Sequence, residues 1–301
     1  MKFSSLVLVG VLILTVLTLH GCKKYRLNKQ TTSAEDNALA EDSFDDIFKH
    51  INEAADEQNL DGIAKVVWTS DYTFSSSCAT ITLNPPAWDT TMSPPAWNNT
   101  FPKTLTIDFG SANCVGNDNK ARKGKIISVF SGKHNETGTV VNTTLDDYHV
   151  NDYHIEGTKI AINDGSNSFS IEVDGKVTSP DGNDQVSWKS TRTRTWIEGQ
   201  TTNFWTLNPD SSCCEFFDGI LDDVYSITGT ASGVNRNGRM FQAEITVPLR
   251  VEFCGWIPEI TEGTVEIEPE DLMLRIVDFG DRVCDRTFVV TIGNKSYTKT
   301  Y

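Results

Sequence analysis

The stretch Thr158-Lys-Ile-Ala-Ile-Asn-Asp-Gly-Ser-Asn-Ser-Phe-Ser-Ile-Glu-Val173 carries the pattern that decides the fold of this chain. Its two ends, residues 158–162 and 168–173, are rich in β-branched and aromatic side chains, which favour strands. Between them, Asn163-Asp164-Gly165 is typical of a tight turn, because these residues tolerate left-handed backbone conformations. The stretch therefore predicts two neighbouring antiparallel strands.

Runs of the same kind continue along the chain at residues 105–109, 125–130, 192–197, 240–247, 263–267 and 287–292. The turn signals that separate them include Asp174-Gly175, Asp181-Gly182, Asn237-Gly238 and Gly293-Asn294. Because such short loops join neighbouring strands, we expect an all-β domain over residues 63–301, folded as an antiparallel meander. The pattern leaves open whether the sheet forms a sandwich, an open curved sheet or a barrel.

One helix is expected before this domain, over residues 33–62. Apolar residues recur there at three- and four-residue steps, and Ser33 or Ser43 can cap the helix. The segment from Asn59 to Gly62 supplies a stop signal. We expect an amphipathic helix whose apolar face covers the β domain, and a partner-binding helix is the alternative.

The N-terminus has the order of a secretory signal peptide over residues 1–21. Lys2 precedes an apolar run at residues 6–19, which is shorter than the roughly 20 residues that a membrane-spanning helix needs. Leu19-His20-Gly21-Cys22 resembles the lipobox of bacterial lipoproteins, and the resemblance implies that Cys22 is acylated and anchors the chain to a membrane. Residues 22–32 are polar and predict a flexible tether.

The location within the cell envelope is suggested by a second resemblance. Lipoproteins of Bacteroidota that reach the cell surface often carry acidic residues directly after the cysteine, whereas Lys23 and Lys24 follow Cys22 here. The comparison favours the outer membrane, with the protein facing the periplasm rather than the cell surface.

Charge excludes one class of partner. The chain has 41 acidic and 26 basic residues and a formal net charge of −15. Binding to nucleic acid requires a basic surface that displaces counterions from phosphates, so we expect no nucleic-acid partner.

Six cysteines remain besides Cys22, an even number in a chain that is expected to leave the cytoplasm, and disulfides are therefore the natural interpretation. The sequence does not decide the pairing, although Cys78 with Cys114 and Cys254 with Cys284 each bracket a strand-like segment. No Cys-x-x-Cys pair occurs, which disfavours a thiolate zinc site. The disulfide candidates are Cys78, Cys114, Cys213, Cys214, Cys254 and Cys284.

An internal repeat consists of Asp108-Phe109-Gly110 followed by Cys114, and Asp278-Phe279-Gly280 followed by Cys284 at the same spacing. The repeat suggests that the β domain has two similar halves. Protein kinases also contain Asp-Phe-Gly, but this chain lacks their other motifs. Together with residues 102–110, 122–126, 155–158 and 192–196, the segment 277–285 resembles a family of uncharacterised Bacteroidota lipoproteins. That resemblance implies export and a β-rich domain, and it assigns no catalytic residue.

Three groups of residues are candidates for ligand binding. Trp88 and Trp97 each end a Pro-Pro-Ala-Trp motif in a stiff loop, which suits capture of a carbohydrate or a partner protein, although tryptophans that cover the end of a β domain are more common. Arg192, Arg194 and Trp196 alternate onto one strand face that could hold an acidic or sugar ligand, whereas a solvated face with cation–π contacts is the more common arrangement.

The third group concerns metal binding. A two-residue turn at Asn151-Asp152 would place His149 opposite His154, but two imidazoles are too few ligands, so a pair of exposed histidines is the more common interpretation. We expect no metal and no cofactor.

No nucleophile elbow, zinc-protease motif or phosphate loop is present. We therefore expect a lipid-anchored, non-catalytic binding or structural module of the cell envelope, with the membrane and a glycan or envelope protein as partners. The first alternative is a carbohydrate-binding module that uses Trp88 and Trp97. The second is a glycoside hydrolase, because pairs of carboxylates such as Asp222-Asp223 are frequent in this acidic chain.

Overall fold

The computed structural model describes residues 29–58, 60, 79–116, 118–200, 221–255 and 257–300. The predicted signal peptide, Cys22 and most of the predicted tether lie outside these residues. Within the described part, the helix is α2 (Thr32–Glu57), which ends five residues before the predicted boundary at 62. No helix in the described ranges combines the length and the apolar character that crossing a membrane requires.

The remaining elements are strands, in agreement with the predicted all-β class. In chain order they are β1 (Thr80–Asn84), β2 (Trp88–Asp89), β3 (Ala96–Trp97), β4 (Lys103–Asp108), β5 (Cys114–Val115), β6 (Ala121–Phe130), β7 (Val140–Val150), β8 (Tyr153–Gly165), β9 (Ser168–Thr178), β10 (Gln185–Glu198), β11 (Val224–Val234), β12 (Met240–Cys254), β13 (Ile257–Pro269), β14 (Arg275–Asp281), β15 (Thr287–Ile292) and β16 (Lys295–Thr300).

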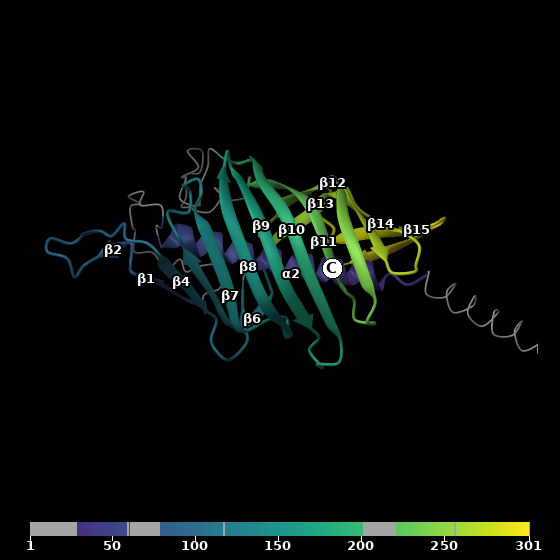
Figure 1. Ribbon diagram of the computed structural model, residues 1–301, viewed down its shortest axis with the longest axis horizontal. Coiled ribbons are helices and arrows are strands. Elements are labelled where there is room, and N and C mark those ends of the chain that lie inside the picture. Colours follow the sequence, from purple (N-terminus) through teal and green to yellow (C-terminus); the bar gives the residue numbers. More distant parts are fainter. Residues whose placement is uncertain are drawn as a thin grey trace, which may run out of the picture.

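Fourteen of the strands form one antiparallel sheet that follows the chain order from β1 to β16, with β5 attached to β6 and with β2 and β3 paired separately. In the described residues, the edge strands β1 and β16 are not paired with each other. The sheet is therefore a meander that stays open, which is one of the three arrangements that the sequence allowed. It curves strongly around helix α2, which crosses the strands on the inner face (Figure 1).

Helix α2 is enclosed on every side. No described side chain of the helix is exposed: the charged Asp36 and His50 are each 0% exposed, and the apolar Phe44 is 2% exposed. The expectation of a helix with one covered, apolar face was therefore too narrow, because its polar face is covered as well. The N-terminal cap is Thr31, whose carbonyl accepts from the amides of Ala34 and Glu35. Ser33 and Ser43, the predicted caps, make other hydrogen bonds.

Two predicted turns were wrong. Asn163-Asp164-Gly165 belongs to the end of β8, and the turn lies at Ser166 and Asn167, whose φ angles of 51° and 59° are left-handed. Asp174-Gly175 lies inside β9, where Gly175 faces the helix. A Cβ atom at Gly175 would lie 2.2 Å from Cζ of Phe44. Glycine therefore marks the point of closest approach between sheet and helix, not a turn.

The two Asp-Phe-Gly segments have the same local structure. The Asp108 carboxylate accepts a hydrogen bond from the amide of the glycine two residues later at 2.8 Å, and Asp278 does so at 2.9 Å. Both phenylalanines, Phe109 and Phe279, are buried. The likeness is local, since both segments belong to one continuous sheet, and the division into two similar halves stays a prediction.

The contact between Gly175 and Phe44 leads to a test by double-mutant cycle. We expect Gly175→Ala to lower the free energy of unfolding by about 1–3 kcal/mol, because the added methyl group overpacks against the Phe44 ring. In a Phe44→Leu background, which removes the ring edge, the same substitution should have less than about half that effect. Urea unfolding measures both. An equal loss in the two backgrounds would contradict this packing.

Candidate functional site

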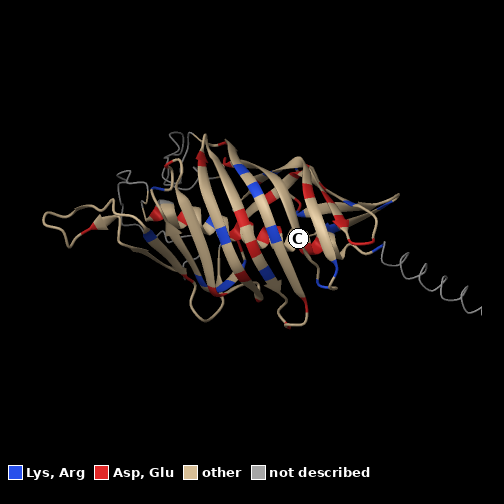
Figure 2. Ribbon diagram, viewed as in Figure 1, with Lys and Arg blue, Asp and Glu red and all other residues tan. Residues whose placement is uncertain are grey.

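The inner face of the sheet carries an unusual number of buried cationic side chains. A buried charge is strongly unfavourable unless it is paired and hydrogen-bonded, so each of these residues needs a partner. Helix α2 supplies many of the partners, because acidic residues recur along it where the strands with basic residues cross it (Figure 2). The buried cationic residues are Lys103, Lys120, Arg122, Lys159, Arg192, Arg194 and Arg275.

Arg192 forms a two-pronged ion pair with the helix. Its Nε donates to Oε1 of Glu41 at 2.9 Å and its Nη2 donates to Oε2 at 2.5 Å. Arg192 is 4% exposed, whereas Thr191 and Thr193 on the other face of β10 are exposed. The interpretation of the arginine face as the solvated one was therefore wrong, because the helix covers it. The acidic partner of Arg192 is therefore a carboxylate of the protein itself, that of Glu41.

Arg122 binds two carboxylates at once. Its Nε and Nη2 donate to Asp46 at 2.9 Å and 2.6 Å, and its Nη1 donates to Asp118 at 3.0 Å. Burial raises the pKa of Asp46, but the opposing attraction of Arg122 and Lys120 is larger and holds that pKa well below its usual range. Asp46 is therefore ionised at neutral pH despite being buried.

Arg194 connects the helix to the wall of a cavity. Its guanidinium lies 4.0 Å from the ring centre of Tyr225 and 4.9 Å from that of Phe48, and its Nη1 is 3.5 Å from Oδ1 of Asp45. Trp196 stacks on Tyr225 with ring centres 6.1 Å apart. The predicted alternation of Arg192, Arg194 and Trp196 onto one face is confirmed, but this face is the inner one.

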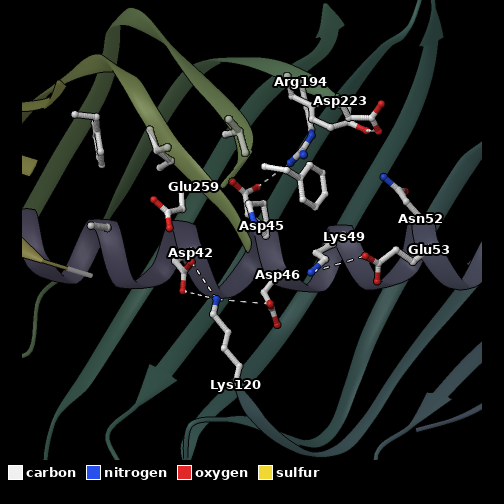
Figure 3. A pocket seen from close by; sticks show the side chains of 17 residues that line it. Asp42, Asp45, Asp46, Lys49, Asn52, Glu53, Lys120, Arg194, Asp223 and Glu259 are labelled. Atoms are coloured by element: carbon white, nitrogen blue, oxygen red, sulfur yellow. Dashed lines mark hydrogen bonds and ion pairs between the residues drawn. The ribbon is translucent and has the colours of Figure 1, made fainter. Parts of the chain in front are cut away.

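A cavity of about 100 Å³ lies between helix α2 and the part of the sheet from β10 to β14. We call it the helix–sheet cavity. Helix residues form one side, and Figure 3 shows their carboxylates and those of the sheet around the same space. Its lining residues are Ala38, Asp42, Asp45, Asp46, Lys49, Asn52, Glu53, Lys120, Arg194, Asp223, Tyr225, Val251, Phe253, Pro258, Glu259, Ile260 and Phe279.

Asp223 brings an incompletely bonded carboxylate to this cavity. Its Oδ2 accepts from the Tyr225 hydroxyl at 3.0 Å, whereas Oδ1 accepts no well-formed hydrogen bond among the described residues. The indole N–H of Trp196 is nonetheless close enough to lower the pKa of this carboxyl group. The residue is 6% exposed. Burial raises the pKa of Asp223 to about 7, and the hydrogen bond from Tyr225 offsets only part of this effect. The carboxyl group is therefore close to half-ionised at neutral pH.

Glu259 is a second carboxylate of this kind. It is 6% exposed, its Oε1 is 3.9 Å from Nε of Arg286, and its Oε2 has no hydrogen-bond partner in the described part of the chain. Burial raises its pKa as well, and the attraction of Arg286 offsets only part of this effect. Two buried oxygen atoms without a well-formed hydrogen bond thus belong to residues that line one small space.

The wall opposite the helix is apolar and is fastened by a disulfide. Val251, Phe253, Ile260 and Phe279 supply apolar surface. The predicted pair Cys254–Cys284 forms a disulfide that joins the end of β12 to the loop after β14. Cys114 is also disulfide-bonded. Cys78, Cys213 and Cys214 lie outside the described residues.

The tryptophan loop is a separate feature. Trp88 and Trp97 are cross-strand partners in the β2–β3 hairpin, which projects from one end of the molecule (Figure 1). Their rings meet edge to face with centres 5.2 Å apart, and the residues are 47% and 39% exposed. The expectation that they cover the end of the β domain was therefore wrong, because much of both residues remains exposed. Glycan binding at this hairpin stays a prediction.

The two candidate histidines lie where the turn predicted them. His149 and His154 are paired residues of β7 and β8, and the left-handed φ angles of Asn151 and Asp152 mark the turn between them. Asp147, which the sequence analysis did not connect with them, lies beside both rings.

The comparisons with known proteins assign no family to this chain. No protein-family model matches the chain, and no curated protein or solved structure is significantly similar to it.

Proposed function

We propose that this chain is a non-catalytic binding protein of the bacterial cell envelope, held at a membrane by lipid on Cys22, and that its helix–sheet cavity binds a small organic cation. One observation carries the choice of ligand: beside an apolar wall, Asp223 and Glu259 each keep a buried oxygen atom that accepts no well-formed hydrogen bond. Leaving a buried acceptor unsatisfied costs about 1–3 kcal/mol, which a bound N–H donor would recover.

The ion pairs around the cavity support a cationic ligand. Six carboxylates and three cationic side chains line it. Lys49, Lys120 and Arg194 already have partners on the helix, at 3.8 Å, 3.0 Å and 3.5 Å. Asp46 is bound by Arg122. Three lining carboxyl groups have raised pKa values: those of Asp45, Asp223 and Glu259. Because Asp45 faces Arg194, Asp223 and Glu259 are the ones that a cation from outside would stabilise most.

Size and shape restrict that cation. A cavity of about 100 Å³ is somewhat smaller than the roughly 150 Å³ apolar cavity that holds benzene in an engineered protein. Apolar and aromatic side chains with a few polar groups are the usual composition of a small-molecule site, and aromatic rings such as Tyr225 attract ammonium groups. An ammonium or guanidinium group with a small apolar substituent fits this description.

The membrane tether is supported by the position of Cys22 at the end of the apolar run. Residues 23–31 separate it from helix α2, and nine extended residues span at most about 30 Å. The polar composition of residues 23–28 suits a tether between membrane and domain. The domain would then lie close to the membrane surface, facing the periplasm.

Binding of isobutylammonium tests the cavity. We expect isothermal titration calorimetry to detect saturable binding to the full chain, and Asp223→Asn and Glu259→Gln to weaken it about tenfold each, because a charge-assisted hydrogen bond contributes about 1.5–3 kcal/mol. Asp174→Asn, on the outer face, is the matched control. Isobutyl alcohol, the neutral counterpart, should not bind. Equal binding of the alcohol, or undiminished binding by both cavity variants, would refute a cation site.

The pH dependence of the same binding follows from Asp223. Because burial raises the pKa of its carboxyl to about 7, the group is mostly neutral at pH 6 and mostly ionised at pH 8. A cation binds the ionised form, so its affinity should rise about tenfold between these pH values. Asp223→Asn should flatten this rise. A pH-independent affinity of the unmutated chain would contradict the assignment.

The tether is tested separately, in bacterial cells. We expect the unmutated chain in the membrane fraction and Cys22→Ser in the soluble periplasmic fraction, because acyl chains contribute about 0.8 kcal/mol for each buried methylene group. Mass spectrometry should find the mature chain beginning at an acylated Cys22. Membrane retention of Cys22→Ser would overturn the tether while leaving the cavity proposal untouched.

A further inference from the structure

The hairpin of β7 and β8 brings two imidazole rings together on the outer face of the sheet. His149 and His154 are direct cross-strand partners. Their ring centres are 4.5 Å apart and the ring planes differ by only 15°. Side chains that face each other in this way act as a unit, since their Cβ atoms are held about 5 Å apart by the strand pairing.

An irregularity in β7 adds a carboxylate to the pair. The register between β7 and β8 shifts between Thr144 and His149, and Asp147 has a left-handed φ of 47°. Oδ1 of Asp147 lies 3.8 Å from Nδ1 of His149 and 3.9 Å from Nε2 of His154. One ligand atom from each of the three side chains lies within 4.8 Å of the other two.

Hydrogen bonds around the rings decide which nitrogen atom of each histidine can bind a metal, and for His149 this is Nε2 rather than the Nδ1 that faces Asp147. Nδ1 of His149 is 2.8 Å from the carbonyl oxygen of Asp147, and a carbonyl only accepts, so this nitrogen carries the proton and Nε2 keeps its lone pair. Nδ1 of His154 is 3.7 Å from a carboxylate oxygen of Glu156, and its Nε2 faces Asp147. A carboxylate behind a ligating histidine is the usual second partner in metal sites.

We propose that Asp147, His149 and His154 form a surface site for a divalent transition metal, with Zn²⁺ as the best fit. Two imidazoles and one carboxylate are a ligand set that zinc accepts, with a fourth position left for water. Bonds of about 2.1 Å in a tetrahedral site separate neighbouring ligand atoms by roughly 3.4 Å. Reaching this separation requires the two stacked rings to turn so that their in-plane lone pairs converge on one point.

Accessibility distinguishes this group from the two other metal-like clusters of the described residues. The side chains of Asp147, His149 and His154 are 78%, 15% and 34% exposed. The cluster of Asp46, His50 and Asp118 is fully buried, and its carboxylates bind Arg122. The cluster of Cys254, Glu259 and Cys284 has its sulfur atoms joined as a disulfide. Neither offers a metal two free ligands.

Two neighbouring cations moderate the site. Lys123 of β6 is the cross-strand partner of His149 on its other side, and Lys176 of β9 forms an ion pair with Glu156. Both ammonium groups oppose a bound cation, whereas the carboxylate of Asp147 favours one. Ca²⁺ and Mg²⁺ prefer sites made of oxygen ligands, so the two imidazoles select a transition metal against both.

Titration of the untagged full chain with Zn²⁺ alone, at pH 7.5, tests the site. We expect one Zn²⁺ to bind per chain, with His149→Gln and His154→Gln each weakening binding at least tenfold and Asp147→Asn about tenfold. The matched control is His134→Gln, which removes a histidine outside the group and should leave binding unchanged. Ca²⁺ and Mg²⁺ should give no signal.

A second readout guards against misfolded variants. Zn²⁺ should raise the Tm of the unmutated chain and of His134→Gln but not that of His154→Gln, whose Tm without metal should equal that of the unmutated chain. The proposal fails if the unmutated chain shows no saturable binding below roughly 1 mM Zn²⁺. It fails equally if His149→Gln and His154→Gln bind as tightly as the unmutated chain.

Discussion

The structure depends on the enclosure of an acidic helix by a single curved sheet. A helix packed this closely takes carboxylates such as those of Asp36, Glu41 and Asp46 out of water, and an unpaired buried charge would destabilise the fold by several kcal/mol. The sheet meets this constraint with cationic residues at inward positions: Arg122 binds Asp46, Arg192 binds Glu41, and the backbone amide and Nε of Arg236 bind Asp36. Sheet curvature, strand register and helix position are therefore linked through the same contacts.

The candidate site lies where this pairing is incomplete. Along most of α2, each acidic residue meets a basic one at hydrogen-bonding distance. Next to β11 and β13 the facing residues are instead Asp223 and Glu259, which are acidic themselves, and the wall between them is apolar. The pKa values of both carboxyl groups are raised by burial, since no nearby cation compensates fully. The same principle that explains the fold thus supports the proposal that this cavity binds a cation.

The sequence predicted the class and the order of the fold well, because hydrophobic alternation and short turns specify an antiparallel meander. It also predicted the opposition of His149 and His154, which follows from hairpin geometry, and the Cys254–Cys284 pair, because these cysteines bracket a segment with strand character. It failed at Gly175, where a glycine inside a strand has the same local signal as a glycine in a turn. The face of Arg192 was misjudged for a related reason: alternation separates the two faces of a strand but does not say which one is covered.

Asp223 and Glu259 were not recognised as one site because they are far apart in the sequence and meet only through the curvature of the sheet. One signal of the enclosure was available in the sequence. Helix α2 is rich in acidic residues, and several strands carry basic residues of the opposite charge.

Hydrogen exchange of the α2 amides is the most direct test of the central claim that the sheet encloses this helix. Buried elements of a cooperative unit exchange only through global unfolding, whereas a helix docked on a surface opens locally at a much lower free energy. The account predicts that the amides of residues 36–51 are protected to the same degree as those of β8, β9 and β10, the central strands that wrap the helix. Exchange of the helix amides orders of magnitude faster than that of these strands would show that α2 leaves the sheet without unfolding it, and would contradict the account.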